Sequence, residues 1–151
     1  MRAVLQRVTN ASVTVDCETV GEIGKGFLIL LGVTHGDTQA EAELLARKIS
    51  GLRVFSDKQD RMNLSLLDIE GEALVVSQFT LAADCSHGRR PSFTRAAKPQ
   101  EANGLYEYFI AKIDGLLGKK TQTGQFGADM KVTLVNDGPV TILLDTDEIM
   151  R

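Results

Sequence analysis

The chain has 151 residues, a formal net charge of −3 and a sequence pI of about 5.4. Its 43% hydrophobic and 25% charged residues are typical of one globular domain, residues 1–151. An acidic chain lacks the basic footprint of a DNA-binding protein, so we expect no DNA partner and only local contact with RNA. No apolar run approaches the ~18 residues of a membrane span, and residues 1–4 begin a strand pattern rather than a signal peptide. We therefore expect a cytoplasmic protein with no membrane partner.

Strand patterns dominate the first part of the chain. Residues 3–15 alternate in the manner of a strand and are rich in β-branched side chains, which predicts a long strand. Closely spaced glycines predict a hairpin over residues 18–26. The apolar run of residues 27–33 is typical of a central strand that is buried on both faces.

A helix and a polar turn follow. Thr38 and Glu41 have the spacing of a capping box, in which each side chain satisfies an exposed backbone group of the first helical turn. Gly51 is expected to end this helix. The helical stripe comprises Leu44, Leu45, Lys48, Ile49 and Leu52. Residues 52–55 are predicted as a short strand and residues 56–63 as a turn.

Residues 64–69 and 73–81 have the composition of strands. They flank residues 70–72, Glu-Gly-Glu, which predicts a tight hairpin. Residues 82–98 form the longest stretch without periodicity, and loops of this length in compact domains are commonly functional. Arg89 and Arg90 in this loop are our candidates for contact with phosphate groups.

Pro99 suits the first position of a second helix, because its missing N–H needs no partner there. Gly118 is expected to end that helix, whose buried stripe is predicted to be Leu105, Phe109, Ile113 and Leu116. Residues 130–135 and 140–144 are predicted as two closing strands around a turn. The pattern as a whole predicts a single α+β domain, in which a mostly antiparallel, barrel-like β-sheet carries two main helices.

Two short segments place polar or conformationally special residues directly after β-forming runs. One is Ser77-Gln78-Phe79-Thr80-Leu81 and the other is Asn136-Asp137-Gly138-Pro139-Val140-Thr141. These are the two places where we expect the chemistry. Each residue also has an ordinary explanation: Ser77 and Thr80 as hydroxyls that satisfy local backbone groups, Gln78 as an edge residue, Phe79 as core, and Gly138–Pro139 as a plain turn.

Metal and histidine chemistry have little support. His35 and His87 are the two histidines, and Cys85-Ser86-His87 falls short of the three or four ligands that a metal site needs. Cys17 is the other cysteine, and the spacing of Cys17 and Cys85 matches no metal-binding or disulfide pattern. We predict no metal, no cofactor and reduced thiols. A hydrolase on this chain would work without the usual histidine machinery.

Five motifs in order resemble the bacterial D-aminoacyl-tRNA deacylase family over essentially the whole length. They are Gln6-Arg7-Val8, the two segments above, Arg90-Pro91-Ser92-Phe93, and Thr121-Gln122-Thr123-Gly124 running into Phe126 and Met130. The resemblance implies a homodimeric hydrolase whose partner is the 3′ end of aminoacyl-tRNA. It would cleave the ester that joins a D-amino acid to tRNA, release both products, and keep D-residues out of translation.

The resemblance also implies roles for individual residues. Gly138–Pro139 is expected to contain a cis peptide bond and to reach into the partner's pocket, where fixed backbone carbonyls reject L-aminoacyl groups. Phe126, Met130 and Phe79 are expected to line the adenosine and pocket walls, with core packing as the alternative. Arg7 is expected to support the Gly-Pro segment, with a simple edge charge as the alternative.

Residues 77–80, namely Ser77, Gln78, Phe79 and Thr80, form the expected catalytic segment, and two mechanisms compete. In one, Thr80 is the nucleophile or positions water. In the other, the substrate's own 2′-hydroxyl activates water while backbone N–H groups of this segment stabilise the oxyanion. We favour the second because the sequence offers no acid/base pair. Two other functions stay open: a non-catalytic module that binds nucleic-acid 3′ ends or peptides, and an esterase or amidase acting on free D-aminoacyl compounds.

Overall fold

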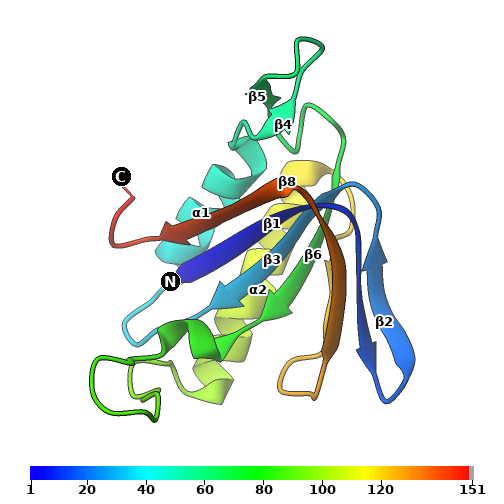
Figure 1. Ribbon diagram of the computed structural model, residues 1–151. Helices are drawn as coiled ribbons and strands as arrows, with labels where there is room; N and C mark the ends of the chain where they lie inside the picture. The colour runs from blue at the N-terminus through cyan, green and yellow to red at the C-terminus, as the bar shows by residue number, and fades with distance from the viewer. Residues whose placement is uncertain (150–151) are drawn as a thin grey trace.

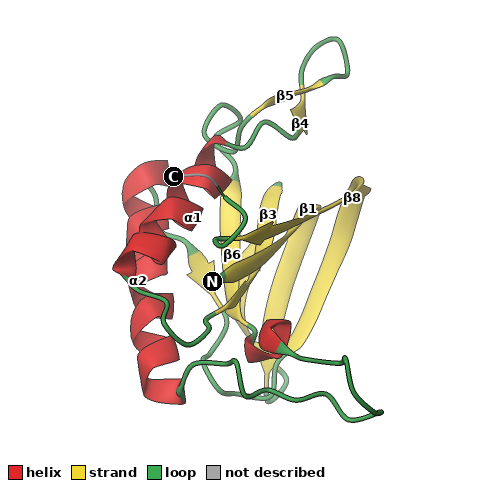
Figure 2. Ribbon diagram, turned by 90° about the vertical axis from the view of Figure 1, so that its left-hand side faces the viewer, coloured by secondary structure: helices red, strands yellow, loops and turns green. Residues whose placement is uncertain are grey.

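Two α-helices lie side by side on one face of a strongly curved sheet in the computed structural model, which describes residues 1–149 (Figures 1 and 2). The helices are α1 (Gln39–Gly51) and α2 (Pro99–Leu117). A short 3-10 helix, η1 (Phe79–Ala82), follows one strand directly. The strands are β1 (Arg2–Val15), β2 (Glu18–Ile23), β3 (Gly26–Gly32), β4 (Phe55–Ser56), β5 (Met62–Leu64), β6 (Glu72–Ser77), β7 (Gln122–Thr123) and β8 (Lys131–Asp145).

The long strand β1 organises the sheet. It pairs antiparallel with β2, β3 and β8, whereas β3 pairs with β6 and β6 with β7 in parallel. β4 and β5 form a separate antiparallel hairpin that stands away from the body (Figure 1). At the far edge the backbone of Gly21 in β2 lies against the carbonyl of Thr123 in β7, so the sheet nearly closes. The expected α+β domain with a barrel-like sheet is therefore confirmed, with mixed pairing.

The central strands are buried on both faces, as predicted for residues 27–33. Alternate residues of β3 and β6 pack beneath the helices, where they join the larger core: Phe27, Ile29, Leu31, Ala73 and Val75. The residues between them face a second core inside the curved sheet: Leu28, Leu74 and Val76. Because both faces are covered, these strands have nearly continuous apolar sequences rather than alternating ones.

Helix α1 begins with the predicted capping box. The Thr38 hydroxyl accepts a hydrogen bond from the Ala40 N–H, and Glu41 Oε2 accepts one from the Thr38 N–H at 2.8 Å. The helix ends at Gly51, again as expected. The strand predicted at residues 52–55 is shifted, since β4 comprises Phe55–Ser56 and residues 52–54 lie outside it.

The hairpin predicted over residues 64–81 is wrong. β5 pairs with β4, and β6 joins β3 in parallel instead. A reciprocal pair of hydrogen bonds turns the chain at residues 65–70: the Ser65 N–H donates to Asp68 Oδ2 at 2.8 Å, and the Asp68 N–H donates to Ser65 Oγ at 3.1 Å. This turn ends the β4–β5 hairpin and sends the chain back to the edge of β3.

The prediction of two separate strands joined by a turn at residues 136–139 is also wrong. β8 runs from Lys131 to Asp145 along β1, and its register is interrupted opposite residues 6–10. Asn136 spans the interruption, because its Nδ2 donates to the carbonyls of Arg7 at 3.1 Å and Val140 at 2.9 Å. The Gly-Pro segment is therefore an irregularity within one long strand.

The buried stripe of α2 differs from the prediction at its end. Ala102, Tyr106, Phe109 and Ile113 are its buried residues, and Leu117 continues the stripe. Leu116 is 38% exposed. A spacing of four residues after Ile113 keeps a side chain on the buried face better than a spacing of three.

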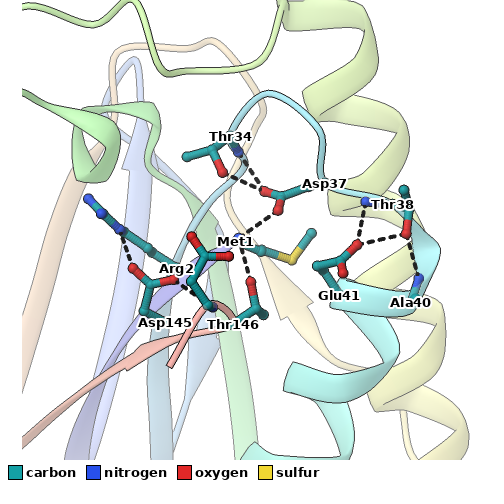
Figure 3. A network of polar contacts seen from close by, with 10 residues as sticks. Met1, Arg2, Thr34, Asp37, Thr38, Ala40, Glu41, Asp145 and Thr146 are labelled. Carbon is teal, nitrogen blue, oxygen red and sulfur yellow. Dashed lines mark hydrogen bonds and ion pairs between the residues drawn. The ribbon is translucent and has the colours of Figure 1, made fainter. Parts of the chain in front are cut away.

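The amino group of Met1 is buried between two distant parts of the chain (Figure 3). It donates to Asp37 Oδ1 at 2.7 Å and to Thr146 Oγ1 at 2.8 Å. Asp37 Oδ2 accepts a further hydrogen bond from the Thr34 N–H at 2.6 Å. This network ties the start of β1 to the segment before α1 and to the residues after β8.

Candidate functional site

A cavity of about 680 Å³ opens where β6 ends and α2 begins. Ser77, Gln78 and Phe79 line it from the carboxyl end of β6, and Phe126 and Met130 line it from the connection between β7 and β8. The structure thus brings together five of the nine site residues expected from the sequence. Twelve other residues also line the cavity and were not expected as site residues, among them Phe93, Lys98 and Pro99.

The η1 turn is held against the end of β3. The Gln78 N–H donates to the carbonyl of Leu31 at 2.8 Å. Gly32 makes this approach possible, because a Cβ at that position would lie 2.9 Å from Leu81 Cβ and 3.0 Å from the Gln78 carbonyl oxygen. The sequence Ser-Gln-Phe-Thr therefore leaves the strand and coils at the cavity mouth.

Thr80 lies on η1, exposed and outside the cavity lining. Its Oγ1 accepts a hydrogen bond from Gln78 Nε2 at 2.5 Å. Among residues 1–149, no carboxylate or imidazole hydrogen bonds to this hydroxyl. The N–H groups of Phe79 and Thr80 begin η1 and find no acceptor in that part of the chain. Such paired free donors are suited to stabilising a developing oxyanion.

Aromatic side chains shape the mouth and the wall of the cavity. Phe79 is 56% exposed, so core packing is the wrong interpretation for it. Its ring meets that of Phe93 edge to face, with centroids 5.1 Å apart. Phe126 packs on Tyr106 of α2 at 5.9 Å, and the sulfur of Met130 accepts a hydrogen bond from the Gln125 N–H at 3.4 Å. Phe126 and Met130 therefore contact a core and line the cavity as well.

Tyr106 packs against Phe126 of the cavity wall, and the ionisation of its phenol provides a test of its burial. Its hydroxyl donates to the Val75 carbonyl at 3.0 Å, and burial raises the pKa of Tyr106 to about 12 from 10.0. A raised pKa means that the stability from the neutral phenol is complete below pH 10 and is lost as the pH rises through 12. We expect the free energy of unfolding of the wild type to fall between pH 10 and 12 relative to that of Tyr106→Phe. At neutral pH the variant should be less stable by about 1 kcal/mol.

Denaturant unfolding at several pH values measures both effects. The Val75 carbonyl also accepts the Gly124 N–H at 3.2 Å, so it keeps a partner in the variant. If the free energies of unfolding of the two proteins change by the same amount from pH 9 to 12, the Tyr106 phenol is not buried as described.

The Gly138–Pro139 peptide is cis, and Arg7 holds Asp137, the residue that precedes it. Arg7 is 8% exposed. Its Nε donates to the Asp137 carbonyl at 3.0 Å and lies 3.6 Å from Asp137 Oδ2, and its Nη1 donates to the Val54 carbonyl at 2.6 Å. The guanidinium therefore bridges the Gly-Pro segment and the base of the β4–β5 hairpin, and it is no simple edge charge.

The Gly-Pro segment and the cavity lie at opposite ends of the sheet within one chain. Arg7 pairs with Phe27 at the start of β3, whereas Ser77 pairs with Leu31 near its end. Four residues of strand separate these positions by ~13 Å, before any lateral offset. Gly138 and Pro139 are accordingly not among the residues that line the cavity.

Metal-ligating side chains do not gather in the described part of the chain. Among residues 1–149, no group of three or more histidine, cysteine, aspartate or glutamate side chains is placed to hold an ion. Cys17 and Cys85 are both exposed free thiols. No helix over the same residues is long and apolar enough to cross a membrane.

The fold and the cavity define a class: an α+β protein with two helices on a mixed, barrel-like sheet and an apolar pocket at the carboxyl ends of its parallel strands. The family model described as D-Tyr-tRNA(Tyr) deacylase matches residues 4–145. The chain belongs to this family, as its five motifs predicted.

Individual relatives agree with this assignment. A D-aminoacyl-tRNA deacylase of Roseiflexus castenholzii is 62% identical over 97% of this chain and 92% of the relative. Among solved structures, the c-Myc DNA Unwinding Element Binding Protein is similar with a TM-score of 0.90 and 43% identity, over 96% of this chain and 98% of that one. A probable eukaryotic D-amino acid tRNA deacylase shares the fold with a TM-score of 0.81 at 16% identity, over 95% of this chain and 97% of that one.

Proposed function

We propose that this protein hydrolyses the ester bond between a D-amino acid and the 3′ end of tRNA. The observation that carries the proposal is the convergence of residues 77–79, Phe126 and Met130 on one cavity in a chain of the deacylase family. Aromatic rings suit an unpaired terminal adenine, and the apolar volume suits an amino-acid side chain. Water adds to the carbonyl carbon, the bond to the ribose oxygen breaks, and that oxygen takes a proton.

Chiral selection in this proposal needs a second copy of the chain. The Gly-Pro segment is too far from the cavity of its own chain, but it is solvent-exposed and braced by Arg7. In a homodimer, the segment of one copy enters the cavity of the other. Its fixed carbonyls accept hydrogen bonds from the substrate's ammonium group and occupy the space that an L side chain requires. Rejection by fixed atoms explains a broad tolerance of D side chains better than a shaped pocket does.

The proposed chemistry uses backbone donors and the substrate's own hydroxyl. The N–H groups of Phe79 and Thr80 stabilise the oxyanion, and the ribose 2′-hydroxyl orients and activates the attacking water. Thr80 has no base partner to make it a nucleophile. The Gln78 side chain, which donates to the Thr80 hydroxyl, sets the conformation of the turn that presents both donors.

Replacing Thr80 separates the two mechanisms. If Thr80 positions the turn, Thr80→Ala should lower the single-turnover rate on D-Tyr-tRNA by less than about 10-fold, because the backbone donors remain. Loss of a true nucleophile costs on the order of 10⁴-fold or more. Thr80→Ser, which keeps the hydroxyl, is the matched control, and a loss of that larger size in Thr80→Ala alone would establish Thr80 as the nucleophile.

The first test of the proposal is release of amino acid from D-Tyr-tRNA and L-Tyr-tRNA, side by side, at substoichiometric protein. We expect rapid release from the D-ester alone, in a cytoplasm-like buffer without added metal. Survival of both esters would favour the non-catalytic binding module. Equal cleavage of both would exclude chiral rejection, and equal rates on small D-aminoacyl esters would favour an esterase that ignores tRNA.

A further inference from the structure

Residues 84–92 form a closed arm at the cavity mouth. The Asp84 and Ser92 N–H groups each donate to the other residue's carbonyl, at 2.8 and 2.9 Å, and so close the base of the arm. Phe93 continues from the arm into the cavity lining, where it meets Phe79. Figure 2 shows this loop extending away from the body of the molecule below η1. The arm is therefore anchored to the cavity rim by backbone hydrogen bonds and an aromatic contact.

The arm and the residues that follow it, up to Lys98, are positively charged. Residues 84–98 contain one acid, Asp84, and four bases, Arg89, Arg90, Arg95 and Lys98. Their net charge of +3 contrasts with −3 for the whole chain, so the other residues together carry −6. A positive segment on an otherwise acidic protein attracts an anionic partner to that one place.

The basic side chains of the arm are available for a partner. Arg89, Arg90 and Lys98 are exposed, and none of their side chains has an ion pair or hydrogen bond with any of residues 1–149. The one acid of the segment is engaged locally, because Asp84 Oδ1 accepts the Ser86 N–H at 2.9 Å. Hydrogen bonds from Ser86 also lower the pKa of Asp84, so it stays an anion held at the base of the arm.

The start of α2 adds to the positive potential. Lys98 occupies the N-cap position without a side-chain capping hydrogen bond, and both Lys98 and Pro99 line the cavity. The N-terminal end of a helix this long has a partial positive charge that favours nearby anions. The cavity lining is mainly apolar, with Lys98 and Asp129 as its charged residues, and Asp129 is already paired with Lys131.

We infer that the arm, residues 84–92, binds phosphate groups of the RNA strand whose 3′ end enters the cavity, with Arg89 and Arg90 as the contacting residues. This inference rests on the proposed function, because it assigns the strand adjoining the terminal nucleotide to the arm. The cavity binds the reacting 3′ end of the tRNA, and the arm binds phosphate groups of the strand next to it. Phosphate contacts carry no sequence information, so the arm serves tRNAs of different sequence equally.

The test is the salt dependence of binding to uncharged tRNA. The slope of log K against log salt is negative, and each phosphate contact that is lost reduces its magnitude by ~0.7 for a single strand and ~0.9 for a duplex. The double variant Arg89→Ala with Arg90→Ala should therefore make the slope less negative by roughly 1.4 to 1.8. Lys119→Ala with Lys120→Ala is the matched control, since it removes the same charge beyond the far end of α2 and should leave the slope unchanged. Equal slopes for wild type and the arginine variant would overturn the inference.

Activity on two substrates separates this inference from the proposed function. The arginine variant should have a several-fold higher KM for D-Tyr-tRNA, an unchanged kcat, and unchanged hydrolysis of 3′-O-(D-tyrosyl)adenosine, which has no phosphate. Equal losses on both substrates would show that the arm supports the cavity rather than RNA. If the wild type cleaves neither ester but the slopes still differ, the deacylase proposal fails and the arm remains an RNA contact.

Discussion

Gly138→Ala is expected to lower D-aminoacyl-tRNA deacylation by at least about 100-fold, the scale of loss that misplacing a positioning group produces. A Cβ at this position would lie 2.8 Å from Arg7 Nη2 and 2.9 Å from Val140 Cγ2. The φ of Gly138 is +128°, which side-chain-bearing residues rarely adopt. The extra methyl group must therefore move both the Gly-Pro segment and the guanidinium that braces it.

Gly118→Ala is the matched control, read by single-turnover kinetics alongside thermal unfolding. Gly118 has φ +66° at the end of α2, and a Cβ there would meet nothing within 4 Å. It should cost about 1 kcal/mol of stability and leave the rate unchanged. Equal kinetic loss in the two variants would mean that the Gly-Pro segment has no special part in the reaction.

Mixing variants tests whether the segment acts between chains. Gly138→Ala has an intact cavity, and Phe126→Ala has an intact Gly-Pro segment. If a site combines the cavity of one copy with the segment of the other, chains mixed after unfolding and refolding should recover activity that neither variant has alone. No recovery in a mixture that forms dimers would place the segment's effect within its own chain.

Asp37→Asn is expected to lower the free energy of unfolding by about 3–5 kcal/mol, because it leaves a buried ammonium group without its counterion. Met1 is 1% exposed and the Asp37 side chain is 7% exposed. For a chain of this length, the loss corresponds to a fall in Tm of roughly 6–20 °C. Thermal unfolding by circular dichroism measures it.

An exposed ion pair provides the comparison for stability. Lys131 and Asp129 lie 3.1 Å apart, but their side chains are 75% and 87% exposed. Asp129→Asn should change the stability by less than about 0.5 kcal/mol, since water and salt screen such pairs. If the two substitutions shift Tm equally, burial does not make the Met1–Asp37 contact special.

Local signals predicted local structure well. The capping box at Thr38, the start of α2 at Pro99 and the burial of β3 on both faces each depend on neighbouring residues or on a simple periodicity. The prediction failed at residues 64–81, where strand composition on both sides of a glycine indicated a hairpin. The choice of partner for β6 depends on β3, some forty-five residues earlier in the chain, and no local pattern encodes it.

The site was predicted only in part, because its residues also come together from distant parts of the chain. Phe79, Phe126 and Met130 were expected at one pocket, and the fold brings them there from either side of α2. Phe93 and Lys98 were missed because their loop has no periodicity. The motif that contains Phe93 was a signal that could have pointed to the cavity, because an aromatic residue in a polar loop needs a partner to pack on.

By itself, the sequence determined the family, the kinds of elements and the residue types available for chemistry, since motif identity, capping and periodicity are properties of short stretches of chain. Tertiary structure alone decided that residues 77–79 share a cavity with Phe126 and Met130, and that the Gly-Pro segment of the same chain stands at the opposite end of the sheet. The physical reason is strand pairing: the parallel register of β3 with β6 and the long antiparallel register of β1 with β8 set these distances. Both registers arise from contacts between residues that are far apart in the chain.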